Sequence, residues 1–78
     1  AEFLGSTFVH ANLSGILLDK ANLMNANLRG ANLAGANLKD AYLYLADLRD
    51  ANLAGADFEG ADLTGTILTG TILEKKEG

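Results

Sequence analysis

The 78-residue sequence contains no cysteine, no proline and no tryptophan. Without cysteine, the chain has no disulfide, no thiolate metal ligand and no cysteine nucleophile. A single histidine, His10, is present, and no carboxylate is spaced to complete a metal or nucleophile site with it. We therefore expect a protein that is not an enzyme, with no catalytic residue, no metal, no cofactor and no small-molecule ligand.

Positive charge and long hydrophobic runs are also scarce. Six basic residues stand against ten acidic ones, for a net charge of -4, which argues against direct contact with nucleic acid and leaves a basic partner open. The longest apolar run, 41–46, is far shorter than the roughly 18 residues of a membrane-spanning helix, and no signal peptide is evident. We expect a soluble protein without membrane contact. The sequence does not fix the compartment, although the cytoplasm is favoured.

One period, of five residues, organises almost the whole sequence. Leucine or phenylalanine occupies all fifteen positions at intervals of five from Phe3 to Leu73. Alanine stands two residues earlier in eleven of these units, and asparagine or aspartate stands between them in nine. Glycine fills the fifth position in eight units. The repeat defines one domain over residues 1–75, followed by a charged tail at 76–78.

The period of five distinguishes between folds. On an α-helix, successive leucines would step around the axis by about 140° and would form no single buried face. On a continuous strand, an odd period would send successive leucines to opposite faces. Both conflicts disappear if the chain turns a corner once per unit, because alanine and leucine, two residues apart, then face one interior. Glycine, asparagine and aspartate tolerate such corners.

The motif Ala-[Asn/Asp]-Leu-x-x, seen in 21–23, 31–33 and 61–63, resembles that of the pentapeptide-repeat family. The resemblance covers residues 1–75. It implies an all-β fold, a right-handed quadrilateral parallel β-helix, which is a solenoid with four units per coil. Leucine, phenylalanine and alanine would point inward, and fifteen units would make about four coils.

With twenty residues per coil, residue i would lie above residue i+20, so that each side forms columns of outward residues. Opposite charges alternate along two columns of the fourth side, which predicts ion pairs between coils. Asparagines recur along the third side, where we expect amide ladders. These columns are Asp19–Lys39–Glu59, Lys20–Asp40–Gly60 and Asn12–Asn32–Asn52.

The first side gathers the largest group of outward apolar residues, which is typical of a binding hot spot. A competing interpretation is that Tyr44 only covers Met24 within the column. At the C-terminal edge, outward isoleucines and unpaired backbone groups predict self-association, or a capping segment elsewhere in the protein. The candidate interaction patch is Leu4, Met24, Tyr42, Tyr44 and Leu45, and the candidate end contact is Ile67 and Ile72.

Two functions are compatible with these features. The first is a non-catalytic structural or protein-interaction module that presents flat β-helix faces to a protein partner, whose identity the sequence does not reveal. The alternative comes from the resemblance, because some members of the family mimic B-form DNA and act on type II topoisomerases such as gyrase. Mimicry requires a strongly acidic rod, whereas here basic residues interrupt the acidic ones: Lys20, Arg29, Lys39 and Arg49.

Overall fold

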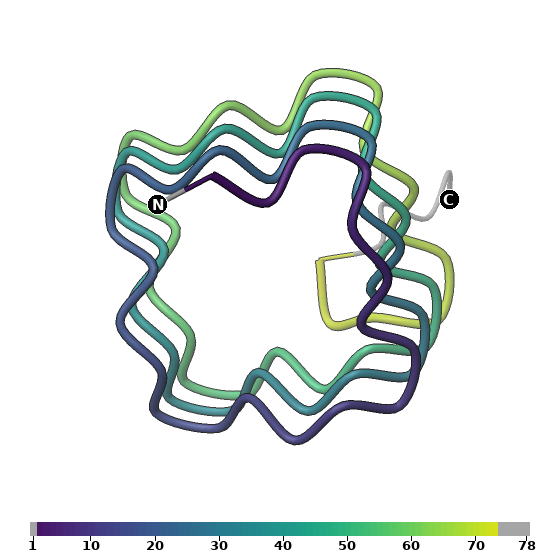
Figure 1. Cartoon of the computed structure of the whole chain (residues 1–78). Helices are drawn as coiled ribbons and strands as arrows, with labels where there is room; N and C mark the ends of the chain where they lie inside the picture. The colour runs from purple at the N-terminus through teal and green to yellow at the C-terminus, as the bar shows by residue number, and fades with distance from the viewer. Residues whose placement is uncertain (1, 74–78) are drawn as a thin grey trace, which may run out of the picture.

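In the computed structural model, residues 2–73 wind into a four-sided coil whose successive turns stack on one another (Figure 1). Ten parallel β-bridges join the turns, from Glu2↔Asn22 to Asp47↔Ile67, and every bridge links residues that are 20 apart. The fold is therefore a quadrilateral β-helix, and the twenty-residue register predicted for the stack is confirmed. Four five-residue units bring the chain back to the same side. We number the sides by their first units, 1–5, 6–10, 11–15 and 16–20.

Each unit up to 66–70 contains only one bridged residue, so the described residues 2–73 form isolated bridges rather than longer strands, and no helix. Accordingly, no helix within this range is long and apolar enough to cross a membrane. Backbone hydrogen bonds connect each coil to the next: Leu23 N donates to Tyr42 O at 2.7 Å. The amide before the leucine bonds to the preceding coil, as when Asn27 N donates to Ser6 O at 2.8 Å.

A tight turn closes each unit up to 66–70. Within unit 31–35, for example, the chain turns so that Ala36 N donates to Leu33 O at 3.0 Å, while the corner residue, Gly35, has a φ of +68°. A positive φ at the third residue is the mark of a type II turn, which favours glycine or asparagine. Leu45 also adopts this conformation, although a side chain there costs roughly 1–2 kcal/mol. The corners that are not glycine are His10, Lys20, Asn25, Asp40, Leu45 and Asp50.

The asparagines that precede the leucines cap their own turns. The Oδ1 atom of Asn32 accepts a hydrogen bond from Ala34 N at 3.0 Å, and this N–H takes no part in the ladder between coils. The same bond recurs at nine units, and no hydrogen bond joins one asparagine side chain to another within 2–73, so the predicted amide ladders are wrong. A local partner two residues away satisfies the side-chain oxygen first. The capping residues are Asn12, Asn22, Asn27, Asn32, Asn37, Asp47, Asn52, Asp57 and Asp62.

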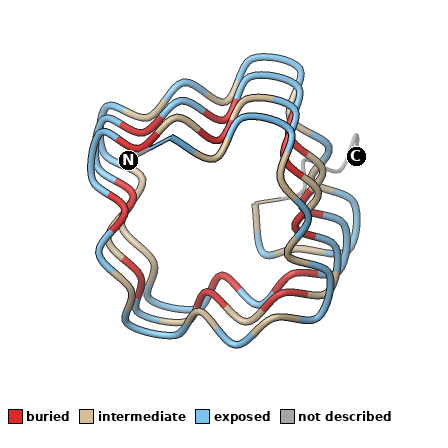
Figure 2. Cartoon of the chain, in the orientation of Figure 1, coloured by how far each residue is buried: buried red, intermediate tan, exposed pale blue. Residues whose placement is uncertain are grey.

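Leucine and alanine form a narrow core in the middle of the column (Figure 2). Seven leucines, at every fifth position from Leu23 to Leu53, are fully buried. Toward the two ends, the inward residues are only partly buried, and the rings of Phe3 and Phe8 meet edge-on at 5.5 Å between centroids. The inward positions predicted from the repeat are thus confirmed.

The ladder stops before the repeat does. No bridge joins Asn52 to Ile72, although the period places both on the third side. Instead Thr71 makes a local turn, in which its Oγ1 donates to Leu68 O at 2.7 Å and accepts from Leu73 N at 3.2 Å. Figure 1 shows this yellow segment turning toward the inside of the square, and Leu73 packs against the core. The rest of the fifteenth unit and the 76–78 tail lie outside the described residues.

The core predicts a sharp difference between neighbouring positions. Replacing Leu33, which is fully buried, by alanine should leave a cavity and cost roughly 2–5 kcal/mol of unfolding free energy. Ala34→Ser, one position outward, should change it by less than about 0.5 kcal/mol. Thermal and denaturant melts of the two variants provide the measurement, and similar losses in both would contradict the assignment of inward and outward positions.

Candidate interaction surface

The first side carries the apolar patch, which consists of Leu4, Met24, Tyr42, Tyr44 and Leu45. The bridges Glu2↔Asn22↔Tyr42↔Asp62 stack the units that supply these residues directly on one another. Four of the side chains are exposed, with fractions of 59% for Leu4, 52% for Tyr42, 38% for Tyr44 and 47% for Leu45, and Met24 is half-buried. The structure therefore brings all five predicted residues to one side of the column.

The two tyrosine side chains hold none of the turns of the repeat. Tyr42 occupies a position where asparagine or aspartate caps the turn in nine other units, and its side chain offers no such bond to Tyr44 N. Within the described range, neither tyrosine hydroxyl makes a hydrogen bond. Leu45 does contact the next coil, because a Cβ atom on Gly65 would lie 2.7 Å from its Cδ2. Unit 41–45 therefore lacks the side-chain hydrogen bond that caps the turn in other units, and it has leucine at a corner where glycine is more favourable.

The fourth side does not form the ion pairs expected along its columns. Lys39 Nζ lies 3.6 Å from Asp57 Oδ2, and no pair within 4 Å forms between Lys39 and Asp19 or Glu59. Likewise Lys20 and Asp40 are not paired, so the predicted column pairs are wrong. The long lysine stem reaches the diagonal neighbour on the next coil, a contact that stacked strands allow.

On the second side, Arg49 is held by a carboxylate on its own unit. Its Nη2 lies 2.7 Å from Asp47 Oδ2, and its Nε also donates to Asp47 Oδ1 at 3.0 Å. This side-chain hydrogen bonding lowers the pKa of the Asp47 carboxyl below its ordinary value near 3.8. Arg29, stacked one coil earlier, has asparagine at the equivalent position and forms no ion pair among residues 2–73.

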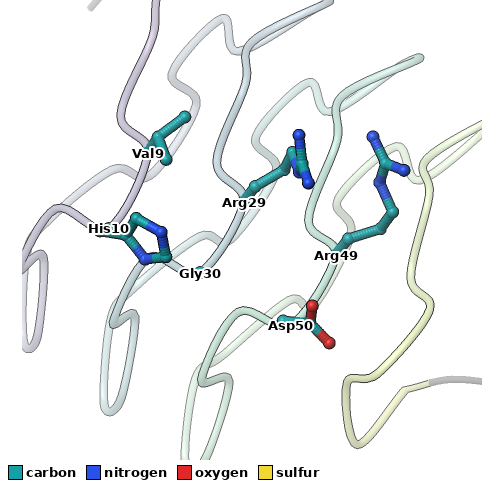
Figure 3. A pocket seen from close by; sticks show the side chains of 6 residues that line it. All are labelled: Val9, His10, Arg29, Gly30, Arg49 and Asp50. Atoms are coloured by element: carbon teal, nitrogen blue, oxygen red, sulfur yellow. The ribbon is translucent and has the colours of Figure 1, made fainter.

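A shallow hollow of about 200 Å³ lies at the corner of this second side (Figure 3). Gly30 lines the hollow, and because it has no side chain, the ring of His10 from the preceding coil lies directly over it. No group of three or more metal-binding side chains occurs in the described part of the chain. This hollow was not predicted from the sequence, although Gly30 stands between two larger corner residues, His10 and Asp50, in one column. Its lining is Val9, His10, Arg29, Gly30, Arg49 and Asp50.

A four-sided coil of stacked β-bridges, with an apolar patch on its first side, is typical of a solenoid repeat protein that exposes flat β faces. Comparison with known sequences gives the family: the model described as Pentapeptide repeats (8 copies) matches residues 6–43 and 41–75. The chain belongs to the pentapeptide repeat family, whose members form right-handed quadrilateral β-helices. Among curated proteins, no relative matches the chain.

Solved structures resemble the chain over nearly its full length. HetL, a pentapeptide repeat protein involved in heterocyst differentiation regulation from the cyanobacterium Nostoc sp. strain PCC 7120, is 42% identical, with a TM-score of 0.88 over 91% of this chain and 33% of HetL. A pentapeptide repeat protein from the Arabidopsis thaliana thylakoid lumen is 33% identical, with a TM-score of 0.85 over 88% of this chain and 48% of that protein. The chain thus spans less than half the length of either protein.

The corner of the second side gives a direct test of how side chains stack between coils. Gly30→Ala and Gly35→Ala each place a side chain at positive φ, at a cost of roughly 1–2 kcal/mol. A Cβ on Gly30 would also lie 2.5 Å from His10 Nδ1, whereas a Cβ on Gly35 meets no atom within 4 Å. Gly30→Ala should therefore lower the melting temperature more. In a double-mutant cycle with His10→Ala, the extra destabilisation of Gly30→Ala over Gly35→Ala should disappear. Equal destabilisation by the two glycine substitutions would refute the contact between His10 and Gly30.

Proposed function

We propose that this chain, a β-helix of about four coils, is a non-catalytic interaction module that binds a protein partner through the apolar patch of its first side. The observation that carries the proposal is the exposure of Tyr42, Tyr44 and Leu45 in one unit that departs from the repeat at every outward position. Clusters of exposed aromatic and aliphatic side chains on a polar surface commonly mark binding sites.

The rest of the described surface supports a binding role over a catalytic one. His10, the single histidine, is exposed at a corner, and no nucleophile or carboxylate is hydrogen-bonded to it. Ser14 Oγ donates to Asn12 Oδ1 at 2.9 Å, so it is oriented by a turn and not by a base. HetL is involved in heterocyst differentiation regulation, and a binding module is compatible with such a role.

DNA mimicry toward a type II topoisomerase receives less support. A mimic needs a continuous acidic surface, whereas lysine and arginine side chains interrupt the acidic side chains on the second and fourth sides. Two acids are engaged in ion pairs, Asp47 with Arg49 and Asp57 with Lys39. We therefore place the interaction module first; inhibition or protection of gyrase in a supercoiling assay at micromolar concentration would favour the mimic instead.

The apolar patch can be tested by removing its aromatic groups. The double substitution Tyr42→Ser and Tyr44→Ser should abolish the retention of protein partners by the immobilised chain, because it deletes the exposed rings. The unfolding free energy should change by less than about 0.5 kcal/mol, because neither ring is part of the core. Quantitative affinity capture and a melt of the same preparation provide the measurements.

A matched control is Leu17→Ser, which removes an isolated apolar side chain, 75% exposed, from the fourth side. This control should retain every partner that the parent chain retains. Loss of partners from both variants would show that exposed apolar side chains in general retain them, and a collapsed melt of the tyrosine variant would show that the tyrosines serve the fold.

We also propose self-association through the C-terminal edge. Ile67 and Ile72 are 42% and 70% exposed, and the N–H groups of Leu63 and Leu68 form no hydrogen bond among the described residues. An edge with apolar side chains and unpaired N–H groups is a template for pairing with another chain.

This edge predicts a concentration-dependent shift in sedimentation at high micromolar concentration. Ile67→Lys should shift the equilibrium toward monomer, because it places a charge beside the edge. Leu17→Ser, far from this edge in the first coil, should sediment like the parent. A parent chain that stays monomeric throughout the range would rule out this contact.

A further inference from the structure

The net negative charge of the column is concentrated on two of its four sides. The second side holds two acids and two bases, which balance, and no charged residue lies on the described part of the third side. The first and fourth sides together hold six acids against two bases, so that they carry the whole net charge of -4 found in residues 2–73. The six acids are Glu2, Asp19, Asp40, Asp57, Glu59 and Asp62, and the two bases are Lys20 and Lys39.

The acidic region adjoins the apolar patch. Asp40 stands at the corner between the fourth and first sides, two residues before Tyr42. On the next coil, Asp62 is bridged directly to Tyr42, and hydrogen bonds from Thr64 lower the pKa of its carboxyl below the ordinary value near 3.8. Of the two bases, Lys39 already faces Asp57 at 3.6 Å. Tyr42 therefore has Asp40 two residues before it in the chain and Asp62 beside it on the next coil, and the carboxylate of Asp40 reaches over Gly60 of that same coil.

We propose that the first and fourth sides together bind a basic amphipathic segment of the partner, whose apolar side chains contact Tyr42 and Tyr44 and whose lysines or arginines meet Asp40 and Asp62. This inference rests on the proposed function and names the chemistry of the partner. Complementary charge steers association and excludes partners of the same sign. Repulsion between like charges disfavours three other ligands: a second copy of this acidic surface, an anionic membrane and nucleic acid.

The test uses two synthetic peptides with one apolar pattern and opposite charge. One contains only leucine and lysine, and the other replaces every lysine by glutamate. By fluorescence anisotropy, the leucine–lysine peptide should bind at least about tenfold more tightly than the leucine–glutamate peptide. Its affinity should fall as salt rises from about 0.05 M to about 0.5 M, because exposed charges are then screened. Tyr42→Ser with Tyr44→Ser should weaken it by a further factor of about ten.

A pair of matched acids separates a specific site from general attraction. Asp40 and Asp50 are both corner residues at positive φ, and each lies over the glycine of the next coil. Asp40→Asn should weaken binding about threefold or more, and Asp50→Asn, on the balanced second side, should have a smaller effect. Amide chemical-shift changes in the parent chain should centre on units 41–45 and 61–65. Equal effects of the two substitutions, or shifts centred on the second side, would overturn the proposal.

The two proposals fail in different ways. If the tyrosine variant loses captured proteins while the two peptides bind equally well, the patch is an interaction site and the basic partner is wrong. If the tyrosine variant retains every captured protein, the proposed function itself fails, whichever peptide binds.

Discussion

Hydrogen bonding between coils at an interval of twenty residues is the constraint on which the whole structure depends. A five-residue unit is too short to form a strand with neighbours of its own, and each unit from 21–25 to 51–55 buries only one alanine and one leucine. Leu33 N, for instance, donates to Asn52 O at 2.8 Å, while Asn32 N donates to Ala11 O at 2.9 Å, so one unit is held by the coils on both sides. The interior can therefore be as narrow as the inward leucine side chains of a single coil, because the backbone hydrogen bonds hold successive coils in register.

Much of this fold could be predicted from the sequence, because the inward positions obey a strict rule. Alanine and leucine two apart, with a corner in every unit, leave few arrangements other than a coil. The register of twenty followed from the family resemblance and not from the period. What the sequence did not predict are the outward contacts: Asn32 caps its own turn, and Lys39 reaches Asp57 diagonally. These depend on side-chain reach and on which backbone N–H groups the ladder leaves unused. The inward turn at Thr71 depends in the same way on a local side-chain bond.

The candidate site could be located from the sequence as a departure from the rule. In most units the outward residues include an asparagine or aspartate that caps the turn and a glycine at the corner. Unit 41–45 has neither, because Tyr42 stands at the capping position and Leu45 at the corner. Natural sequences tend to break local rules at functional sites. The placement of the net charge on the adjoining side was hidden in the sequence, because acids and bases alternate along the chain and separate only when the coil folds them onto sides.

A disulfide trap provides the most direct test of the register. The chain has no cysteine, so Asn32→Cys with Asn52→Cys introduces a single outward pair at a bridged position. Stacked strands lie about 4.8 Å apart, within the Cα separation that a disulfide accepts. The pair should close quantitatively within one molecule under mild oxidation and keep the parent circular dichroism spectrum. Asn32→Cys with Asp57→Cys, on the next side, should stay reduced. Equal closure of both pairs, or closure of the second alone, would contradict a coil of twenty residues.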